Sequence, residues 1–142
     1  MNDCIWNLII KQANKSLKHK DVPVGAIIVK NNKIIAKGCN TREKNNDILG
    51  HAEINAIKSA RKKLKNWNLN DCVMYVSLKP CEMCEEIIKQ SRISKVIYLL
   101  DKPISKKSYK KTSILKFDNE NLEKSYNDIL SDFFKDLREK KG

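Results

Sequence analysis

Residues 73–84, Val-Met-Tyr-Val-Ser-Leu-Lys-Pro-Cys-Glu-Met-Cys, join a short apolar run to two cysteines three positions apart. The run over residues 73–78 is mostly apolar and partly β-branched, which is typical of a buried strand. Pro80 follows it, and proline is favoured in the first turn of a helix. We therefore expect a helix from near Pro80 to about Ser91. A strand that leads directly into a helix indicates an α/β fold.

The segments on both sides continue this alternation. Apolar residues at helical spacing or in short runs predict a helix over 3–18, strands over 26–29 and 33–38, a helix from about 50 to 64, a strand over 95–100, and a last helix that Asp118 or Asn119 caps. Residues 41–49 are polar and are expected to form a loop, and residues 102–116 form a lysine-rich linker. We see no repeat and no domain boundary, so we expect one α/β domain over residues 1–142.

The charge balance points to a polyanionic partner. The 142 residues carry a formal net charge of +12, and the sequence pI is near 9.5. Nucleic acid is the first candidate for such a chain. A second interpretation stays open, because Lys and Asn are abundant throughout the chain and many of these lysines could simply be solvated.

The cysteines and the apolar segments suggest a cytoplasmic protein. No segment has the ~20 consecutive apolar residues that span a bilayer, and the start of the chain lacks the pattern of a signal peptide. The chain has five cysteines. An odd number without a secretory signal predicts reduced thiols, some of which bind a metal.

Two short motifs together suggest a metal site. Cys81 and Cys84 are spaced so that both thiols can face one ion at the start of a helix. His51 and Glu53 lie about 200° apart on a regular helix, so they converge only where the first turn opens, just after Gly50. One His and two Cys provide three protein ligands and leave the fourth position for water, which is the pattern of a catalytic zinc site.

Glu53 is the acidic residue that the metal does not need. Its carboxylate is well suited to move protons between the bound water and a substrate nitrogen. Taken singly, each residue could have an ordinary structural role: Glu53 as a solvated side chain, His51 as a helix cap, and the two cysteines as buried packing residues. The combination, in this order and at the start of two predicted helices, favours the catalytic interpretation.

These motifs resemble those of a known group of enzymes. His51-Ala52-Glu53, then 26 residues, then Pro80-Cys81-Glu82-Met83-Cys84 resembles the zinc signature of the cytidine-deaminase-like superfamily. Within it the chain is most similar to the bacterial-type tRNA adenosine deaminases, over about residues 5–140. Besides the zinc motif, three stretches carry this likeness: Val22–Ala26, Asn40 and Leu130–Phe134.

The resemblance implies a three-layer α/β/α sandwich with a central mixed sheet. It also implies one Zn²⁺ per chain held by His51, Cys81 and Cys84, with Glu53 as the catalytic proton shuttle. The reaction would convert the wobble adenosine of a tRNA anticodon to inosine, and such enzymes are usually homodimers. The base would be unstacked before it enters the pocket.

The resemblance and the pattern of the last helix also suggest substrate contacts. Asn40 would hydrogen-bond the base, Val24 would line its pocket, and the Ala52 backbone would contact the purine. Asn40 has an alternative role as the turn residue that ends the hairpin. In the last helix we assign Phe133 to core packing, Phe134 to base stacking or a dimer contact, and Arg138 to phosphate binding, as part of a contact with the anticodon stem-loop.

Several residues depart from the family pattern, all of them candidates for the substrate mouth: Lys79, Glu85-Glu86, Ile48-Leu49-Gly50 and residues 102–111. The lysines among residues 102–111 are candidates for part of an RNA footprint. Two other functions fit part of this pattern. A deaminase of free cytosine, guanine or a nucleoside would share the chemistry without a basic rim. A catalytically silent RNA-binding subunit with structural zinc would be expected to lack Glu53.

Overall fold

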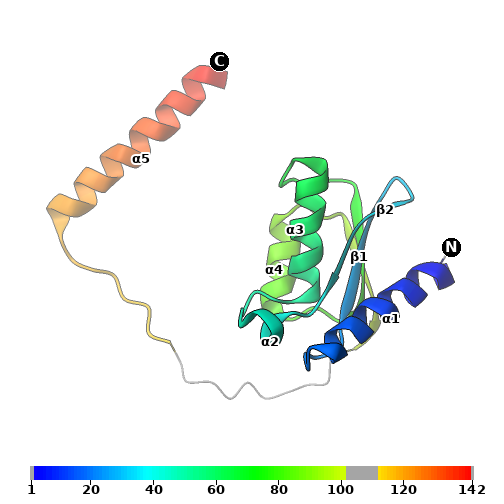
Figure 1. Ribbon diagram of the computed structural model, residues 1–142. Coiled ribbons are helices and arrows are strands. Elements are labelled where there is room, and N and C mark those ends of the chain that lie inside the picture. Colours follow the sequence, from blue (N-terminus) through cyan, green and yellow to red (C-terminus); the bar gives the residue numbers. More distant parts are fainter. Residues whose placement is uncertain (1, 102–111, 142) are drawn as a thin grey trace. The chain divides into compact units, whose positions relative to one another are not determined.

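The computed structural model of the chain describes residues 2–101 and 112–141. In chain order the elements are α1 (Asn2–Lys18), β1 (Gly25–Lys30), β2 (Lys33–Cys39), α2 (Arg42–Asn45), α3 (Ala52–Leu64), β3 (Cys72–Leu78), α4 (Glu82–Gln90), β4 (Lys95–Leu100) and α5 (Glu120–Lys141) (Figure 1). The chain divides into two compact units, residues 1–104 and residues 105–142.

The first unit is built on a four-stranded sheet with the order β2-β1-β3-β4. β1 pairs antiparallel with both β2 and β3, whereas β3 and β4 are parallel. A parallel pair needs a crossover connection, and α4 provides it. The expected mixed sheet is therefore confirmed.

The central strand β1 is buried on both faces, as its unbroken apolar run predicted. Ala26 and Ile28 belong to one buried cluster, together with residues of α3 and α4. Ile27 and Val29 belong to a second cluster, together with residues of α1. The sheet is therefore covered by α1 on one face and by α3 and α4 on the other (Figure 1), which is the expected three-layer α/β/α arrangement.

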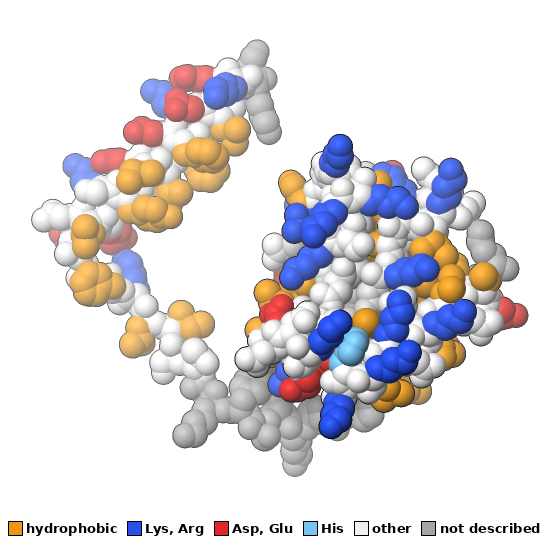
Figure 2. Space-filling model, viewed as in Figure 1, with side chains coloured by type: hydrophobic (Ala, Val, Ile, Leu, Met, Phe, Trp, Pro, Cys, Tyr) orange, Lys and Arg blue, Asp and Glu red, His pale blue; other side chains and the backbone are white. Residues whose placement is uncertain are grey.

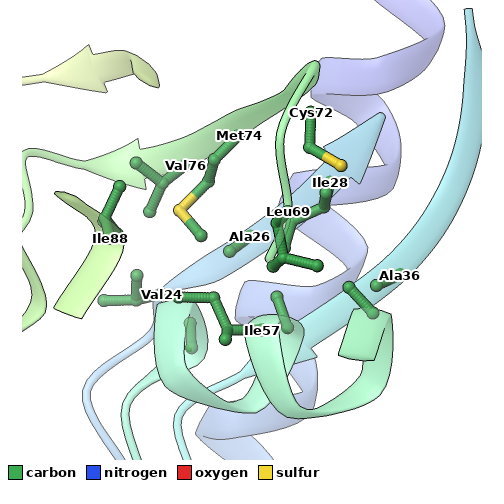
Figure 3. Close-up of a cluster of buried hydrophobic side chains, with 13 residues drawn as sticks. Val24, Ala26, Ile28, Ala36, Ile57, Leu69, Cys72, Met74, Val76 and Ile88 are labelled. Carbon is green, nitrogen blue, oxygen red and sulfur yellow. The ribbon is translucent and has the colours of Figure 1, made fainter. Parts of the chain in front are cut away.

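The larger cluster supports the strand ends that lead to the candidate site. Figure 3 shows Met74 of β3 and Val24, just before β1, in one cluster with Ile57 of α3 and Ile88 of α4. Cys72 lies in the same cluster and is fully buried. This thiol is therefore a packing residue of the core.

Helix α3 approaches β2 very closely at Gly38. A Cβ atom at this position would collide with the carbonyl oxygen of Ala52 and with the backbone nitrogen of Ala56. Glycine lets the two backbones touch. The contact fixes the first turn of α3, which carries Glu53, beside the end of the hairpin.

The order of the predicted elements is confirmed, with one difference. Residues 41–49 were expected to form a loop, but they contain the one-turn helix α2. The reason lies about twenty residues earlier in the sequence. The buried carboxylate of Asp21 accepts hydrogen bonds from the backbone N–H groups of Glu43 (2.6 Å) and Lys44 (3.3 Å). These are donors at the helix start that otherwise lack partners.

The second unit contains α5. The side chain of Asn119 accepts a hydrogen bond from the Leu122 N–H (3.1 Å) and so caps the helix. Of the two predicted cap residues, Asp118 and Asn119, it is therefore Asn119 that acts as the cap. Within this unit the apolar side chains of α5 are exposed, and the rings of Phe133 and Phe134 pack edge to face 5.3 Å apart. Nothing in this unit buries Phe133 among the described residues, so its predicted core role stays a prediction.

Two further expectations concern the chain as a whole. The lysines of residues 102–111 lie outside the described residues, and the single-domain organisation over residues 1–142 stays a prediction. Within residues 2–101 and 112–141, none of the helices has the length and apolar character that crossing a bilayer requires.

Candidate active site

Two helix starts bring the predicted metal ligands together. His51 is the N-cap residue of α3, and Cys81 is the N-cap residue of α4; both have extended backbone angles. Cys84 lies in the first turn of α4. Because His51 precedes the helical turn that contains Glu53, the two side chains are not held to the 200° separation of a regular helix. The prediction that His51 and Glu53 converge where the first turn of the helix opens, just after Gly50, is therefore consistent with the structure.

The ligand atoms have the spacing of one metal ion. His51 Nδ1 lies 3.7 Å from Cys81 Sγ and 3.3 Å from Cys84 Sγ, and all three atoms lie within 4.8 Å of one another. In a tetrahedral zinc site, bond lengths of about 2.0–2.3 Å place neighbouring nitrogen and sulfur atoms about 3.6 Å apart. The observed distances fit such a site without rearrangement.

The electrostatics of Cys84 also call for a cation. Burial raises the pKa of the Cys84 thiol far above its usual range, and the negative charges of Glu53 and Cys81 raise it further. A thiolate at this place therefore needs a positive charge beside it. A divalent ion bound to His51, Cys81 and Cys84 would supply that charge.

Glu53 lies next to this cluster. Its side chain is only 4% exposed, and it is close enough to Cys84 to form a hydrogen bond that contributes to the raised thiol pKa. It also lines a cavity of about 320 Å³ together with His51 and Cys81. A buried carboxylate that faces both the metal ligands and a cavity is placed to exchange protons with a bound molecule.

The remaining residues of the cavity were partly predicted. Val24 and Asn40 line it, as the resemblance implied. Three cationic side chains also line it: Lys20, Arg42 and Lys79. The size is at the lower end of the range for small-molecule pockets, which suits one base. Of the cations, only Lys79 was singled out from the sequence.

Asn40 performs a structural task as well. Its Oδ1 atom accepts a hydrogen bond from the N–H of Ala52 (2.8 Å), and its own N–H donates to the carbonyl of Val24 (3.3 Å). The first bond satisfies a free donor at the start of α3. Ala52 itself is fully buried and is not among the described residues that line the cavity. Its N–H is thus already bonded, and its predicted contact with the purine stays a prediction.

Two positioning residues were missed from the sequence. Asn55 of α3 donates from Nδ2 to the carbonyl of Cys39 (2.8 Å) and to Oγ1 of Thr41 (2.9 Å). Asp21 holds the start of α2, as described above. Together they fix the segment that carries Asn40. The spacing of Asn55, two residues after Glu53, gave no signal because its partners are distant in sequence.

The last of the predicted contacts lie in the second unit. Phe134 and Arg138 are exposed residues of α5. The helix carries six acidic residues, Glu120, Glu123, Asp128, Asp132, Asp136 and Glu139, and five basic ones, Lys124, Lys135, Arg138, Lys140 and Lys141. It is therefore nearly neutral, and the excess positive charge of the chain lies elsewhere. The substrate roles of Phe134 and Arg138 stay predictions.

Comparison with known proteins places this site in a family. Residues 1–138 match the family described as MafB19-like deaminase. The chain belongs to this deaminase family. It is 36% identical over 141 residues to a tRNA-specific adenosine deaminase of Bacillus subtilis (strain 168), covering 93% of this chain and 88% of that protein. It is 43% identical over 89 residues to a tRNA-specific adenosine deaminase of Streptococcus pyogenes (serotype M18), covering 63% of this chain. That match spans only 56% of the streptococcal protein.

Two solved structures share the fold of this deaminase. One comes from biochemical and structural studies of A-to-I editing by tRNA:A34 deaminases at the wobble position of transfer RNA. It has a TM-score of 0.70 and 31% identity, and the match covers 72% of this chain and 78% of that one. The other is guanine deaminase from Bacillus subtilis, with a TM-score of 0.72 and 25% identity over 90% of this chain and 94% of that one. The resemblance drawn from the zinc motif is thereby confirmed.

Proposed function

We propose that this protein is a zinc-dependent tRNA adenosine deaminase that converts the wobble adenosine of an anticodon to inosine. The observation that carries the proposal is the cluster of His51, Cys81 and Cys84 beside the buried carboxylate of Glu53, at the wall of a base-sized cavity. Similarity to tRNA-specific adenosine deaminases over most of the chain supports this substrate.

His51, Cys81 and Cys84 would hold the metal. Two thiolates and a neutral imidazole balance the charge of Zn²⁺, and three protein ligands leave one position open. When bound there, Zn²⁺ would supply a water molecule acidified toward neutrality. The spacing of the three ligand atoms meets the requirement of such a site.

Glu53 performs the proton transfers in the proposed reaction. Its carboxylate accepts a proton from the attacking water and delivers it to N1 of adenine, so that the water oxygen can bond to C6. It then takes the remaining proton from the new C6 hydroxyl and delivers it to the amino group, which leaves as ammonia while the C6=O bond forms. The net reaction adds one water and releases one ammonia. Burial of Glu53 keeps bulk water from competing for these protons.

Other residues of the cavity would position the base. Val24 provides an apolar wall, and Asn40, whose Oδ1 is held by the Ala52 N–H, lines the cavity beside it. A base in an anticodon loop is unpaired and can be unstacked at modest cost. Contacts of Ala52, Phe134 and Arg138 with the anticodon stem-loop, a homodimeric assembly and a cytoplasmic location belong to the same proposal.

The test is inosine formation in RNA. The purified protein is incubated with an anticodon stem-loop that carries adenosine at position 34, and the nucleosides are analysed after digestion. We expect inosine from this RNA and none from a matched stem-loop in which the adenosine is moved by one position. Free guanine, cytosine and adenosine are tested in parallel, because the fold is shared with a guanine deaminase. Deamination of a free base alone would replace the proposed substrate.

A further inference from the structure

Most of the net positive charge of the first unit comes from one stretch of its sequence. Between Cys4 and Arg42 the chain has one acidic residue, Asp21, which is 5% exposed, and eight basic residues: Lys11, Lys15, Lys18, Lys20, Lys30, Lys33, Lys37 and Arg42. Helix α4 instead exposes three glutamates, Glu82, Glu85 and Glu86. Figure 2 shows Lys and Arg side chains gathered on the face formed by α1, β2 and α3, with few acidic side chains among them.

Three of these lysines form a stripe on α1. Lys11, Lys15 and Lys18 are four and three residues apart, so they lie on one side of the helix, and all three are exposed. Trp6 shows which way this side of the helix faces, because its ring packs against the ring of Tyr75 in β3, with 5.9 Å between the ring centroids. Lys15 follows Trp6 by nine residues, a rotation of about 180°. The stripe therefore lies on the side of α1 away from β3, toward the β2 edge of the sheet.

Lys37 continues the stripe on that edge. It pairs with Ile27 across β1 and β2, and directly paired residues point to the same face of a sheet. Ile27 packs in the cluster under α1, so Lys37 stands on the α1 face of the sheet. Because β2 is an outer strand, Lys37 is exposed. We name Lys11, Lys15, Lys18 and Lys37 the α1–β2 lysine row.

The row leads to the candidate active site. Lys20, two residues after the stripe, lines the cavity that contains Glu53. From Lys18 to Lys11 the helix rises about 10 Å, which is the span of a few successive phosphates in a nucleic acid strand. A nucleic acid strand with one nucleotide in the cavity can therefore run along α1 with lysine side chains beside its phosphates.

We propose that the α1–β2 lysine row binds the phosphates of the anticodon stem while the wobble base occupies the cavity. This inference rests on the proposed function, because the cavity must hold one nucleotide of a structured RNA. The exposed glutamates of α4 would repel the phosphates of an RNA stem that ran along α4 instead. Protection of an edge strand against pairing is a known use of lysine; it explains Lys37 but not the stripe on α1.

The test compares two triple variants with equal changes in charge. The first is Lys11→Glu, Lys15→Glu and Lys37→Glu. The matched control is Lys89→Glu, Arg92→Glu and Lys95→Glu, which reverses three exposed cations, in α4, in the turn after it and at the start of β4. For each we measure KM and kcat for full-length tRNA, and tRNA affinity as a function of salt. Metal content and the melting temperature show whether the variants remain folded.

For the row variant we expect KM to rise about tenfold or more near 0.1 M salt, with kcat close to that of the wild type. The slope of log affinity against log salt should fall by about two to three, since each lost phosphate contact removes about 0.7–0.9. The control should keep the KM and slope of the wild type. A milder variant, Lys11→Gln with Lys15→Gln and Lys37→Gln, should show the same effects at smaller size.

Two results would overturn the inference while leaving the proposed function intact. One is a row variant that forms inosine with the KM and salt slope of the wild type. The other is an equal loss in the control, which would mean that net charge and not its position matters. If the wild-type protein forms no inosine in any tRNA, the proposed function itself fails.

Discussion

Asn55 is predicted to stabilise the segment that carries the cavity residue Asn40. Its Nδ2 group donates to the carbonyl of Cys39 at 2.8 Å and to the hydroxyl of Thr41 at 2.9 Å. Asn40, which lines the cavity, lies between these two acceptors in sequence. Replacing Asn55 by alanine removes both bonds and leaves the cavity-lining side chains unchanged.

The magnitude follows from the two bonds. Each hydrogen bond contributes about 0.5–1.5 kcal/mol net, so their loss costs about 1–3 kcal/mol. Alanine is the better helix former and returns up to about 0.7 kcal/mol. We therefore expect the free energy of unfolding to fall by about 1–2 kcal/mol. The melting temperature should decrease by roughly 4–8 °C per kcal/mol for a unit of this size.

The assay combines denaturant unfolding with steady-state kinetics on the anticodon stem-loop. Because the segment around Asn40 loses two of its hydrogen bonds to α3 and keeps the one between Asn40 and Ala52, KM should rise more than kcat falls. Ser59→Ala, at an exposed position of the same helix, is the matched control and should be neutral or slightly stabilising. An Asn55→Ala protein with unchanged stability and unchanged KM would refute this assignment.

Three further predictions concern the metal, the helix packing and α5. Cys84→Ala should lose zinc and melt at a lower temperature, because metal binding is coupled to folding, whereas Cys72→Ala, also buried, should lose core packing but keep zinc by metal analysis. Gly38→Ala should cost about 1–3 kcal/mol, since the new Cβ would collide with the backbone of α3; wild-type stability in denaturant would contradict this. Phe134→Ala with Arg138→Ala should keep zinc and a near-normal melting temperature but deaminate the stem-loop much more slowly. A normal rate would remove α5 from the substrate contacts.

The fold was largely predictable because its signals are local. The apolar run of residues 26–29 predicted a strand, which is buried on both faces. The strand-to-helix junction at residues 73–84 predicted the α/β fold, and the structure shows that this helix connects two parallel strands. Residue type and position narrowed the cap of the last helix to Asp118 or Asn119, and the structure shows that it is Asn119. Such features depend on neighbours in sequence, which is why pattern reasoning finds them.

The missed features depend on partners that are distant in sequence. Helix α2 has no apolar pattern, and the Asp21 carboxylate that caps it comes from the segment after α1. The bonds of Asn55 reach back to Cys39 and Thr41. No local rule joins these residues. The close packing of α3 against β2 at Gly38 brings Asn55 near Cys39 and Thr41.

The candidate site was predictable in its chemistry but less so in its surroundings. His51, Cys81 and Cys84 were chosen by ligand type and spacing, and the structure places their ligand atoms within 4.8 Å. Glu53, Val24 and Asn40 line the adjoining cavity as expected. The bond from Ala52 to Asn40, and the presence of Lys20 and Arg42 at the cavity, needed the folded chain.

The central claim is hydrolytic deamination of an RNA adenosine with Glu53 as the proton carrier. The most direct measurement is mass spectrometry of the inosine formed in an anticodon stem-loop in H₂¹⁸O, for the wild type and for Glu53→Gln. The wild type should form inosine that carries one ¹⁸O atom, with one ammonia released per inosine. Glu53→Gln should bind zinc normally and react at least about 10²-fold more slowly. Inosine at the wild-type rate from Glu53→Gln, or no inosine from the wild type with its metal bound, would contradict the account.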